Sequence, residues 1–146
     1  MAAFEKIVPV RFEDCDPAGI VFYPRYFLMI NRLIEDWFGE ALGLPWQQMH
    51  GVDHSGVPTV RIEIDFRAAS RHGEMLRLAL DVVAVRRSAF TLNIWAEGLE
   101  SGDIRFQARQ TFVYVSTGDG AVKSKALPEE IAARMRAKII GEEQTA

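Results

Sequence analysis

The chain has 146 residues, of which 49% are hydrophobic, and its formal net charge is −3. This length and composition suit a single domain with one core, which we expect to span residues 1–146. The acidic balance argues against a general nucleic-acid-binding surface, which needs an excess of lysine and arginine. No apolar run approaches the ~20 residues of a membrane span, and the first residues lack a signal sequence, so we expect a cytoplasmic protein with no membrane partner.

The first part of the chain predicts one strand and one long helix. Residues 6–12 form a short apolar run, interrupted by Pro9, that suits a first strand at an edge. From residue 23 to residue 42 apolar side chains recur at spacings of three and four, which predicts an amphipathic helix that ends near Gly43. Residues 45–58 show no clear periodicity and are expected to form a loop with at most a short helical turn.

The second part predicts a run of antiparallel strands. Apolar and polar residues alternate in four segments, at residues 60–66, 76–82, 90–96 and 104–115. Residues 128–140 then show helical spacing and suggest a short peripheral helix. One helix followed by such a meander predicts an α+β fold in which the sheet curls around the helix. Its open strand edges favour pairing with a second copy, so we expect a dimer or a larger homo-oligomer.

The segment between the first strand and the helix carries the most distinctive chemistry. Asp16 lies before a compact turn at Ala18 and Gly19, and Pro24 is typical of a first helical turn. A helix start offers backbone N–H groups without helical partners and the positive end of the helix dipole. A carboxylate beside such a start predicts a site that attacks a carbonyl and stabilises the resulting oxyanion.

Residues 14–24 read D-C-D-P-A-G-I-V-F-Y-P. This segment resembles the signature of the hotdog-fold acyl-CoA thioesterases, specifically the 4-hydroxybenzoyl-CoA thioesterase branch, and a weaker resemblance extends from about residue 10 to residue 115. It implies a hotdog fold, an antiparallel sheet wrapped around one long central helix. It also implies that Asp16 is the catalytic carboxylate, that the Tyr23 N–H polarises the thioester carbonyl, and that the family's tetramers are a possible assembly.

Each residue of this segment also has a plainer interpretation. Asp16 has the alternative role of a carboxylate that caps an Asx turn. As a catalytic group it fits both direct attack on the thioester and general-base activation of water, and the sequence does not choose. Glu13 and Asp14 are interpreted as solvated or turn-stabilising charges. Cys15, the single cysteine, has acidic neighbours that disfavour a reactive thiolate, so we expect a buried structural thiol.

Four further residues are candidates for substrate binding. Arg86 and Arg87 lie between two strands, where they suit either a solvated turn or a grip on phosphates, and the resemblance favours contact with the nucleotide part of CoA. Asn31 follows in the helix and is a candidate for the acyl pocket, where the hydroxyaryl enzymes carry an acid. His54 is a candidate for lining the same pocket, and its spacing from His50 gives no convincing metal site.

These observations predict a thioesterase that hydrolyses an aromatic, 4-hydroxybenzoyl-CoA-like, or medium-sized acyl-CoA to the free acid and CoA, without a cofactor or a metal. The alternative is a non-catalytic hotdog module that binds or senses acyl-CoA through the same pocket. A hotdog dehydratase is a weaker option, because it needs a catalytic histidine paired with an acid, and no histidine lies in the segment before the helix.

Overall fold

The computed structural model describes residues 2–139. Its helices are α1 (Pro24–Glu40), α2 (Trp46–Gly51) and α3 (Glu129–Arg136), and a short 3-10 turn, η1, spans Phe12–Asp14. Its strands are β1 (Phe4–Pro9), β2 (Ser55–Gly56), β3 (Thr59–Phe66), β4 (Met75–Val85), β5 (Ala89–Gly98), β6 (Ile104–Val113), β7 (Val115–Ser116) and β8 (Lys123–Ser124).

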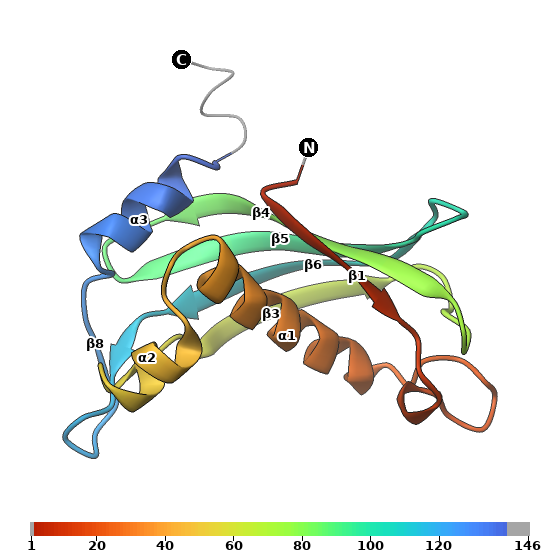
Figure 1. Cartoon of the computed structure of the whole chain (residues 1–146), viewed down its shortest axis with the longest axis horizontal. Coiled ribbons are helices and arrows are strands. Elements are labelled where there is room, and N and C mark those ends of the chain that lie inside the picture. The colour runs from red at the N-terminus through yellow and green to blue at the C-terminus, as the bar shows by residue number, and fades with distance from the viewer. Residues whose placement is uncertain (1, 140–146) are drawn as a thin grey trace.

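Five of these strands form one antiparallel sheet that curls over α1 (Figure 1). The strand order is β1-β4-β5-β6-β3, so β1 and β3 are its edges. Strands β4, β5 and β6 follow one another as hairpins, whereas β3 returns to pair with β6. The predicted α+β hotdog fold, with a sheet wrapped around one long helix, is confirmed.

The core lies between α1 and the concave face of the sheet. The apolar stripe of α1 is buried there, with Trp37 and Phe38 at most 1% exposed. Their rings meet Phe90 of β5 at centroid distances of 6.1 and 6.0 Å. Phe90 in turn stacks on Phe112 of β6 at 4.8 Å. Burial of each such ring contributes roughly 1.5–3 kcal/mol, which fixes α1 across the sheet.

The helix α1 begins and ends where the sequence predicts. Pro24 is its first residue, and the chain leaves the helix through Gly43, whose φ of +74° is the left-handed conformation that glycine adopts without strain. The Leu42 carbonyl beside this glycine accepts a hydrogen bond from Arg134 of α3. The end of the central helix is thereby tied to the C-terminal helix.

Several details differ from the sequence-based expectations. The first strand begins and ends earlier than predicted, because its pairing with β4 starts at Phe4 and ends where Pro9 meets Met75, the first residue of β4. The segment 45–58, expected as a loop, contains α2 and β2, and β2 joins β7 and β8 in a second, small sheet. The predicted C-terminal helix is confirmed as α3, although residue 140 lies outside the described residues. Among the described residues, no helix is long and apolar enough to cross a lipid bilayer.

Candidate active site

Asp16 lies in a tight hairpin that leads into α1. Opposite Asp14, the Phe22 N–H donates to the Asp14 carbonyl at 2.9 Å, and the Asp16 N–H donates to the Ile20 carbonyl at 3.0 Å. Gly19 closes the turn with a φ of +80° and donates its N–H to the Asp16 carbonyl. The hairpin therefore returns the chain so that the start of α1 follows directly beside the segment that carries Asp16.

The Asp16 carboxylate is oriented by its own turn. Its Oδ1 accepts the Ala18 N–H at 2.9 Å, which is the Asx-turn geometry that the sequence left open as an alternative. Within residues 2–139, Oδ2 has no protein hydrogen-bond partner, and the residue is half-buried. One oxygen thus fixes the side chain, and the other remains available to a substrate or a water molecule.

The backbone at the start of α1 leaves one amide available. The Arg25 N–H donates to the Phe22 carbonyl at 2.8 Å, the Tyr26 N–H donates to the Tyr23 carbonyl at 3.1 Å, and Pro24 has no N–H. No acceptor is found for the Tyr23 N–H in the part of the chain that the structure describes. An unpaired amide at the positive end of a helix dipole is a suitable donor to an oxyanion.

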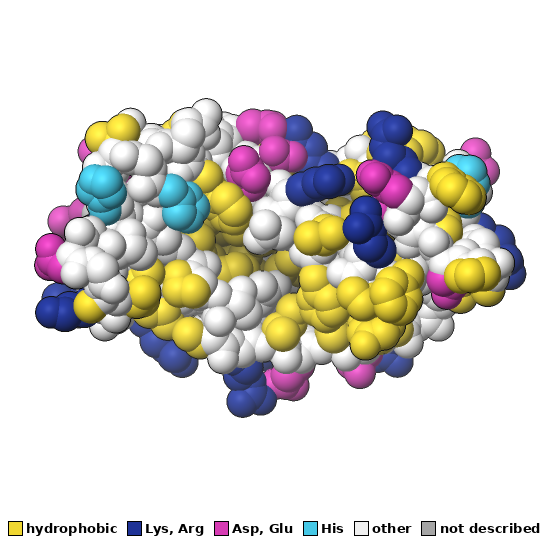
Figure 2. All heavy atoms as spheres, turned by 90° about the horizontal axis from the view of Figure 1, so that it is seen from below, with side chains coloured by type: hydrophobic (Ala, Val, Ile, Leu, Met, Phe, Trp, Pro, Cys, Tyr) yellow, Lys and Arg dark blue, Asp and Glu magenta, His cyan; other side chains and the backbone are white. Residues whose placement is uncertain are grey.

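An open cavity of about 270 Å³ has Tyr23 in its wall, together with Tyr26 and Phe66. Tyr23 and Phe66 are 57% and 46% exposed, and their rings meet edge to face at 5.8 Å. Phe22, also half exposed, packs against Tyr23. Figure 2 shows hydrophobic side chains gathered on this underside of the molecule, next to a hollow. An apolar group of a ligand therefore has a surface beside the Tyr23 amide.

The two residues before Asp16 have structural roles. Asp14 is 7% exposed, accepts the Arg11 N–H at 2.9 Å and lies 3.5 Å from Nε of Arg25. The prediction of a turn-stabilising charge is therefore confirmed for Asp14, whereas a solvated charge is wrong. Cys15 is half-buried, and desolvation, with the charges of Asp14 and Asp16, raises the pKa of its thiol. A raised pKa keeps the sulfur protonated and unsuited to nucleophilic attack.

Three other candidate residues, Arg86, Arg87 and His54, lie at the end of the sheet opposite the Asp16 hairpin. Arg86 and Arg87 are exposed in the turn between β4 and β5. Strand β4 begins beside the Asp16 hairpin and runs eleven residues to that turn, a distance of about 33 Å. His54 is exposed at the same far end, where its carbonyl accepts the Thr117 N–H. Figure 1 shows this separation, with the hairpin at the right and α3, beside the β4–β5 turn, at the left.

Asn31 lies between these two ends, on the exposed side of α1. It follows the first helical residue by seven positions, or about 10 Å along the helix axis. Within one chain, Asp16 thus lies in the hairpin that leads directly to Tyr23 and α1, and Arg86, Arg87 and His54 lie at the other end of the sheet.

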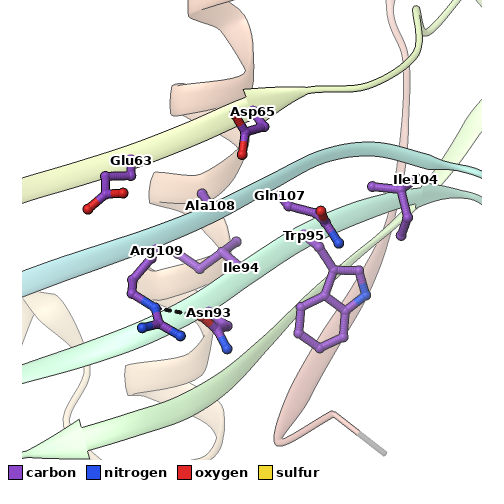
Figure 3. A pocket seen from close by; sticks show the side chains of 9 residues that line it. All are labelled: Glu63, Asp65, Asn93, Ile94, Trp95, Ile104, Gln107, Ala108 and Arg109. Atoms are coloured by element: carbon purple, nitrogen blue, oxygen red, sulfur yellow. Dashed lines mark hydrogen bonds between the residues drawn. The ribbon is translucent and has the colours of Figure 1, made fainter.

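A second cavity, of about 500 Å³, lies on the sheet face turned away from α1 (Figure 3). Its polar lining comes from three strands: Glu63, Asp65, Asn93, Gln107 and Arg109. Arg109 donates to Asn93 at 3.1 Å, and Glu63 pairs with Arg61, whose hydrogen bond lowers the pKa of that carboxylate. This cavity has carboxylates but no helix start, so it lacks the oxyanion donor that acyl transfer requires.

A buried arginine supports the Asp16 hairpin and was missed by the sequence analysis. Arg105 is 3% exposed and binds Ser70, whose carbonyl accepts the Val21 N–H at 2.9 Å. In the sequence, Arg105 is a polar residue next to apolar Phe106 in a strand, which resembles ordinary alternation. The signal that the sequence could have offered is weak, because nothing local indicates that Arg105 is buried like the adjacent Phe106.

Comparison with known protein families identifies the family to which this chain belongs. The family model of the thioesterase-like superfamily matches residues 10–135 of the chain. The match covers most of the chain, including the Asp16 hairpin, α1 and the strands β3 to β6. The chain belongs to the thioesterase-like superfamily, and the predicted family is confirmed.

Two characterised relatives are similar in sequence. The 4-hydroxybenzoyl-CoA thioesterase of Pseudomonas sp. (strain CBS-3) is 29% identical over 84 residues, which span 56% of this chain and 58% of that protein. The match thus spans little more than half the length of that relative. The 1,4-dihydroxy-2-naphthoyl-CoA hydrolase of Synechocystis sp. (strain ATCC 27184 / PCC 6803 / Kazusa) is 26% identical over 117 residues, 80% of this chain and 83% of that protein.

Solved structures share the fold. A 1,4-dihydroxy-2-naphthoyl-CoA thioesterase from Synechocystis superposes with a TM-score of 0.82 at 22% identity, covering 91% of this chain and 95% of that one. A mutant 4-hydroxybenzoyl-CoA thioesterase complexed with 4-hydroxybenzoyl-CoA gives 0.81 at 22% identity, over 90% and 96% of the two chains. These similarities establish the same chain path around the central helix.

Proposed function

We propose that this protein is an acyl-CoA thioesterase that hydrolyses an aromatic, 4-hydroxybenzoyl-CoA-like, or medium-sized acyl thioester to the free acid and CoA. The observation that carries the proposal is that, within residues 2–139, one Asp16 oxygen has no protein partner and the hairpin leads directly to a Tyr23 amide that has none either. Membership of the thioesterase-like superfamily supports it. The proposal requires no cofactor, because the carboxylate and the amide supply both functions of the site.

The reaction follows from these two groups. The Tyr23 N–H donates to the thioester oxygen, and the dipole of α1 favours the negative charge that develops there. Asp16 either attacks the carbonyl carbon and expels the CoA thiolate, leaving an anhydride that water hydrolyses, or it takes a proton from the water that attacks. Both routes consume one water molecule and release the acid and CoA.

The preference for an aromatic acyl group rests on the surface beside Tyr23. Phe22, Tyr23 and Phe66 present exposed rings next to the cavity of about 270 Å³. Aromatic rings stack on such side chains more favourably than flexible alkyl chains of the same area. Both characterised relatives are named for aromatic CoA thioesters, which agrees with this preference.

We also propose that the active form is at least a dimer, formed through β3. This strand is an edge of the sheet, and each of its residues is exposed or half-exposed, including the apolar residues Val60 and Phe66. An exposed edge with apolar side chains favours pairing with another strand. Two copies of β3 paired antiparallel would form one continuous sheet and cover this edge.

Such a dimer explains the separation of the candidate residues. A two-fold axis at β3 places the far end of one sheet beside the near end of the other. The end that carries Arg86, Arg87 and His54 then lies on the same side of the dimer as Asp16 of the second copy. The arginines would hold the CoA phosphates, and Asn31 and His54 would contact the acyl part. A tetramer and a cytoplasmic location stay predictions.

The test is CoA thiol release with benzoyl, hydroxybenzoyl and fatty acyl-CoAs, using wild type, Asp16→Asn and the matched control Glu13→Gln. Glu13 is an exposed acid in the same segment. We expect Asp16→Asn to lower kcat by at least ~10³-fold, since it removes the reacting group, and Glu13→Gln to retain wild-type turnover.

Two outcomes would reject the proposal. Undiminished turnover by Asp16→Asn would remove Asp16 from the reaction. Saturable acyl-CoA binding by the wild type without hydrolysis of any acyl group would instead identify a non-catalytic acyl-CoA binding or sensing module.

A further inference from the structure

The Asp16 hairpin is positioned by the segment 68–74, which connects β3 to β4. The Val21 N–H donates to the Ser70 carbonyl at 2.9 Å, and the His72 N–H donates to the Gly19 carbonyl at 3.3 Å. Between these bonds, residues 20 and 71 form an isolated antiparallel bridge. Any displacement of this segment therefore moves the hairpin that carries Asp16.

The guanidinium of Arg105 forms hydrogen bonds with this segment, and the Arg105 side chain is only 4% exposed. Nη1 donates to the Ala69 carbonyl at 3.1 Å and to the Ser70 hydroxyl at 3.2 Å. Both terminal nitrogens also donate to the Glu74 carboxylate, each at 3.0 Å. Nε donates to Asp103 at 3.1 Å. The planar fork of arginine reaches all of these acceptors at once, which an ammonium group does not do.

The start of α1 converges on the same serine. The Tyr26 hydroxyl donates to the Ser70 hydroxyl at 2.7 Å in a buried contact. Burial raises the pKa of Tyr26, so its hydroxyl stays protonated and keeps donating. Tyr26 lies in the first turn of α1, where its N–H bonds to the Tyr23 carbonyl. Ser70 thus connects to the Asp16 hairpin through its carbonyl and to the Tyr23 turn through its hydroxyl.

Resting on the proposed function, we infer that Arg105 is a positioning residue that acts through Ser70 to fix Asp16 relative to the Tyr23 amide. Arg105 touches neither of the two reacting groups, and its contacts are with the segment behind them. A displacement of about 1 Å in such a constellation costs up to ~10²-fold in rate. We therefore expect the network of contacts that Arg105 makes with Ala69, Ser70 and Glu74 to affect turnover, although Arg105 does not contact Asp16 or the Tyr23 amide.

The fold is expected to survive the loss of the network. The two carboxylates that face Arg105 are partly open to water, with the side chains of Glu74 and Asp103 37% and 51% exposed. Water can solvate them when the guanidinium is replaced, so no fully buried charge is left without a partner. Effects on turnover and on folding can therefore be separated.

The experiment compares Arg105→Lys, Tyr26→Phe and their double variant with Arg77→Lys. Arg77 is the matched control, because it also pairs with two carboxylates on this sheet, Glu5 and Glu97, and does not contact Ser70. We expect Arg105→Lys to lower kcat by ~10- to 100-fold while KM changes by less than ~3-fold. Tyr26→Phe should lower kcat by ~5-fold or more, and the double variant should resemble Arg105→Lys, because both act through one serine.

A second readout does not depend on activity. The backbone amide resonance of Tyr23 should shift in Arg105→Lys and in Tyr26→Phe, and stay in place in Arg77→Lys. Wild-type kcat and an unmoved Tyr23 resonance in folded Tyr26→Phe would overturn the inference, even if Arg105→Lys failed to fold. If Asp16→Asn abolishes turnover while Arg105→Lys and Tyr26→Phe retain it, the positioning role alone is rejected and the proposed function stands.

Discussion

Asp16 and Cys15 are adjacent residues, and only Asp16 is suited to react with a thioester. The Asp16 carboxylate has one oxygen fixed by the Ala18 N–H and the other without a protein partner among residues 2–139. The Cys15 thiol is half-buried, and its Sγ lies 3.5 Å from the Arg11 carbonyl. Two adjacent residues point to opposite sides of a hairpin strand, so only one of them can face a bound thioester.

Replacement of Cys15 by alanine tests this division. Because desolvation, together with the charges of Asp14 and Asp16, raises the pKa of the thiol, we expect it to take no part in the reaction. Cys15→Ala should keep kcat within ~2-fold of wild type, with a modest loss of thermal stability from the small cavity. The measurement is CoA thiol release, and a loss of turnover comparable to that of Asp16→Asn would show that the nucleophile has been assigned to the wrong residue.

At this scale the sequence predicts the proposed reacting group, Asp16, but not the residues that hold it in place. Asp16 and Tyr23 lie within one segment of eight residues, so the local motif and the start of the helix are enough to predict both. Ser70 and Arg105 lie far from them in sequence and meet the hairpin only through the β3–β4 connection and the first residues of β6. Contacts between distant segments leave no local pattern, and such a network is visible only in the folded chain.

The helices and strands also differ in how well the sequence predicts them. The periodicity of α1, β4, β5 and β6 predicts these elements well, because each has one face against the core. Strand β3 shows the same alternation in sequence, although each of its residues is exposed or half-exposed. The helix α2 and strand β2 escape prediction, because a six-residue helix and a two-residue strand are too short to show a period. Strand β2 is formed by its pairing with β7 rather than by local preference.

Strand β3 is the element on which assembly is predicted to depend. Val60 is 60% exposed on this edge, and an aspartate there would have to enter the pairing of two sheets without a partner charge. We expect Val60→Asp to weaken the dimer by at least ~10-fold and to lower kcat/KM with it. Val122→Asp is the matched control, since Val122 is 67% exposed outside β3.

Sedimentation of wild type and both variants over a range of concentrations measures this effect. A wild-type protein that remains monomeric and fully active would contradict the pairing of β3. So would a Val60→Asp variant whose dimer is as stable as that of Val122→Asp.

At the scale of the whole molecule, one chain holds the proposed reacting groups at one end and the candidate phosphate-binding arginines at the other. The strand β4 that separates them is eleven residues long, about 33 Å. The sequence predicts both groups of residues and the tendency to associate, and it does not predict that one chain keeps them apart. The two groups are separated because β4 runs from one to the other along its full length, and the course of β4 is known only from the folded sheet.

The most direct test of the central claim is a crystal structure of Asp16→Asn with a bound aromatic acyl-CoA. We predict that the thioester oxygen lies within hydrogen-bond distance, about 3 Å, of the Tyr23 amide, with its carbon facing residue 16. We also predict that the CoA phosphates lie against Arg86 and Arg87 of a second copy. A thioester bound away from the start of α1, for example in the cavity on the outer face of the sheet, would contradict the account.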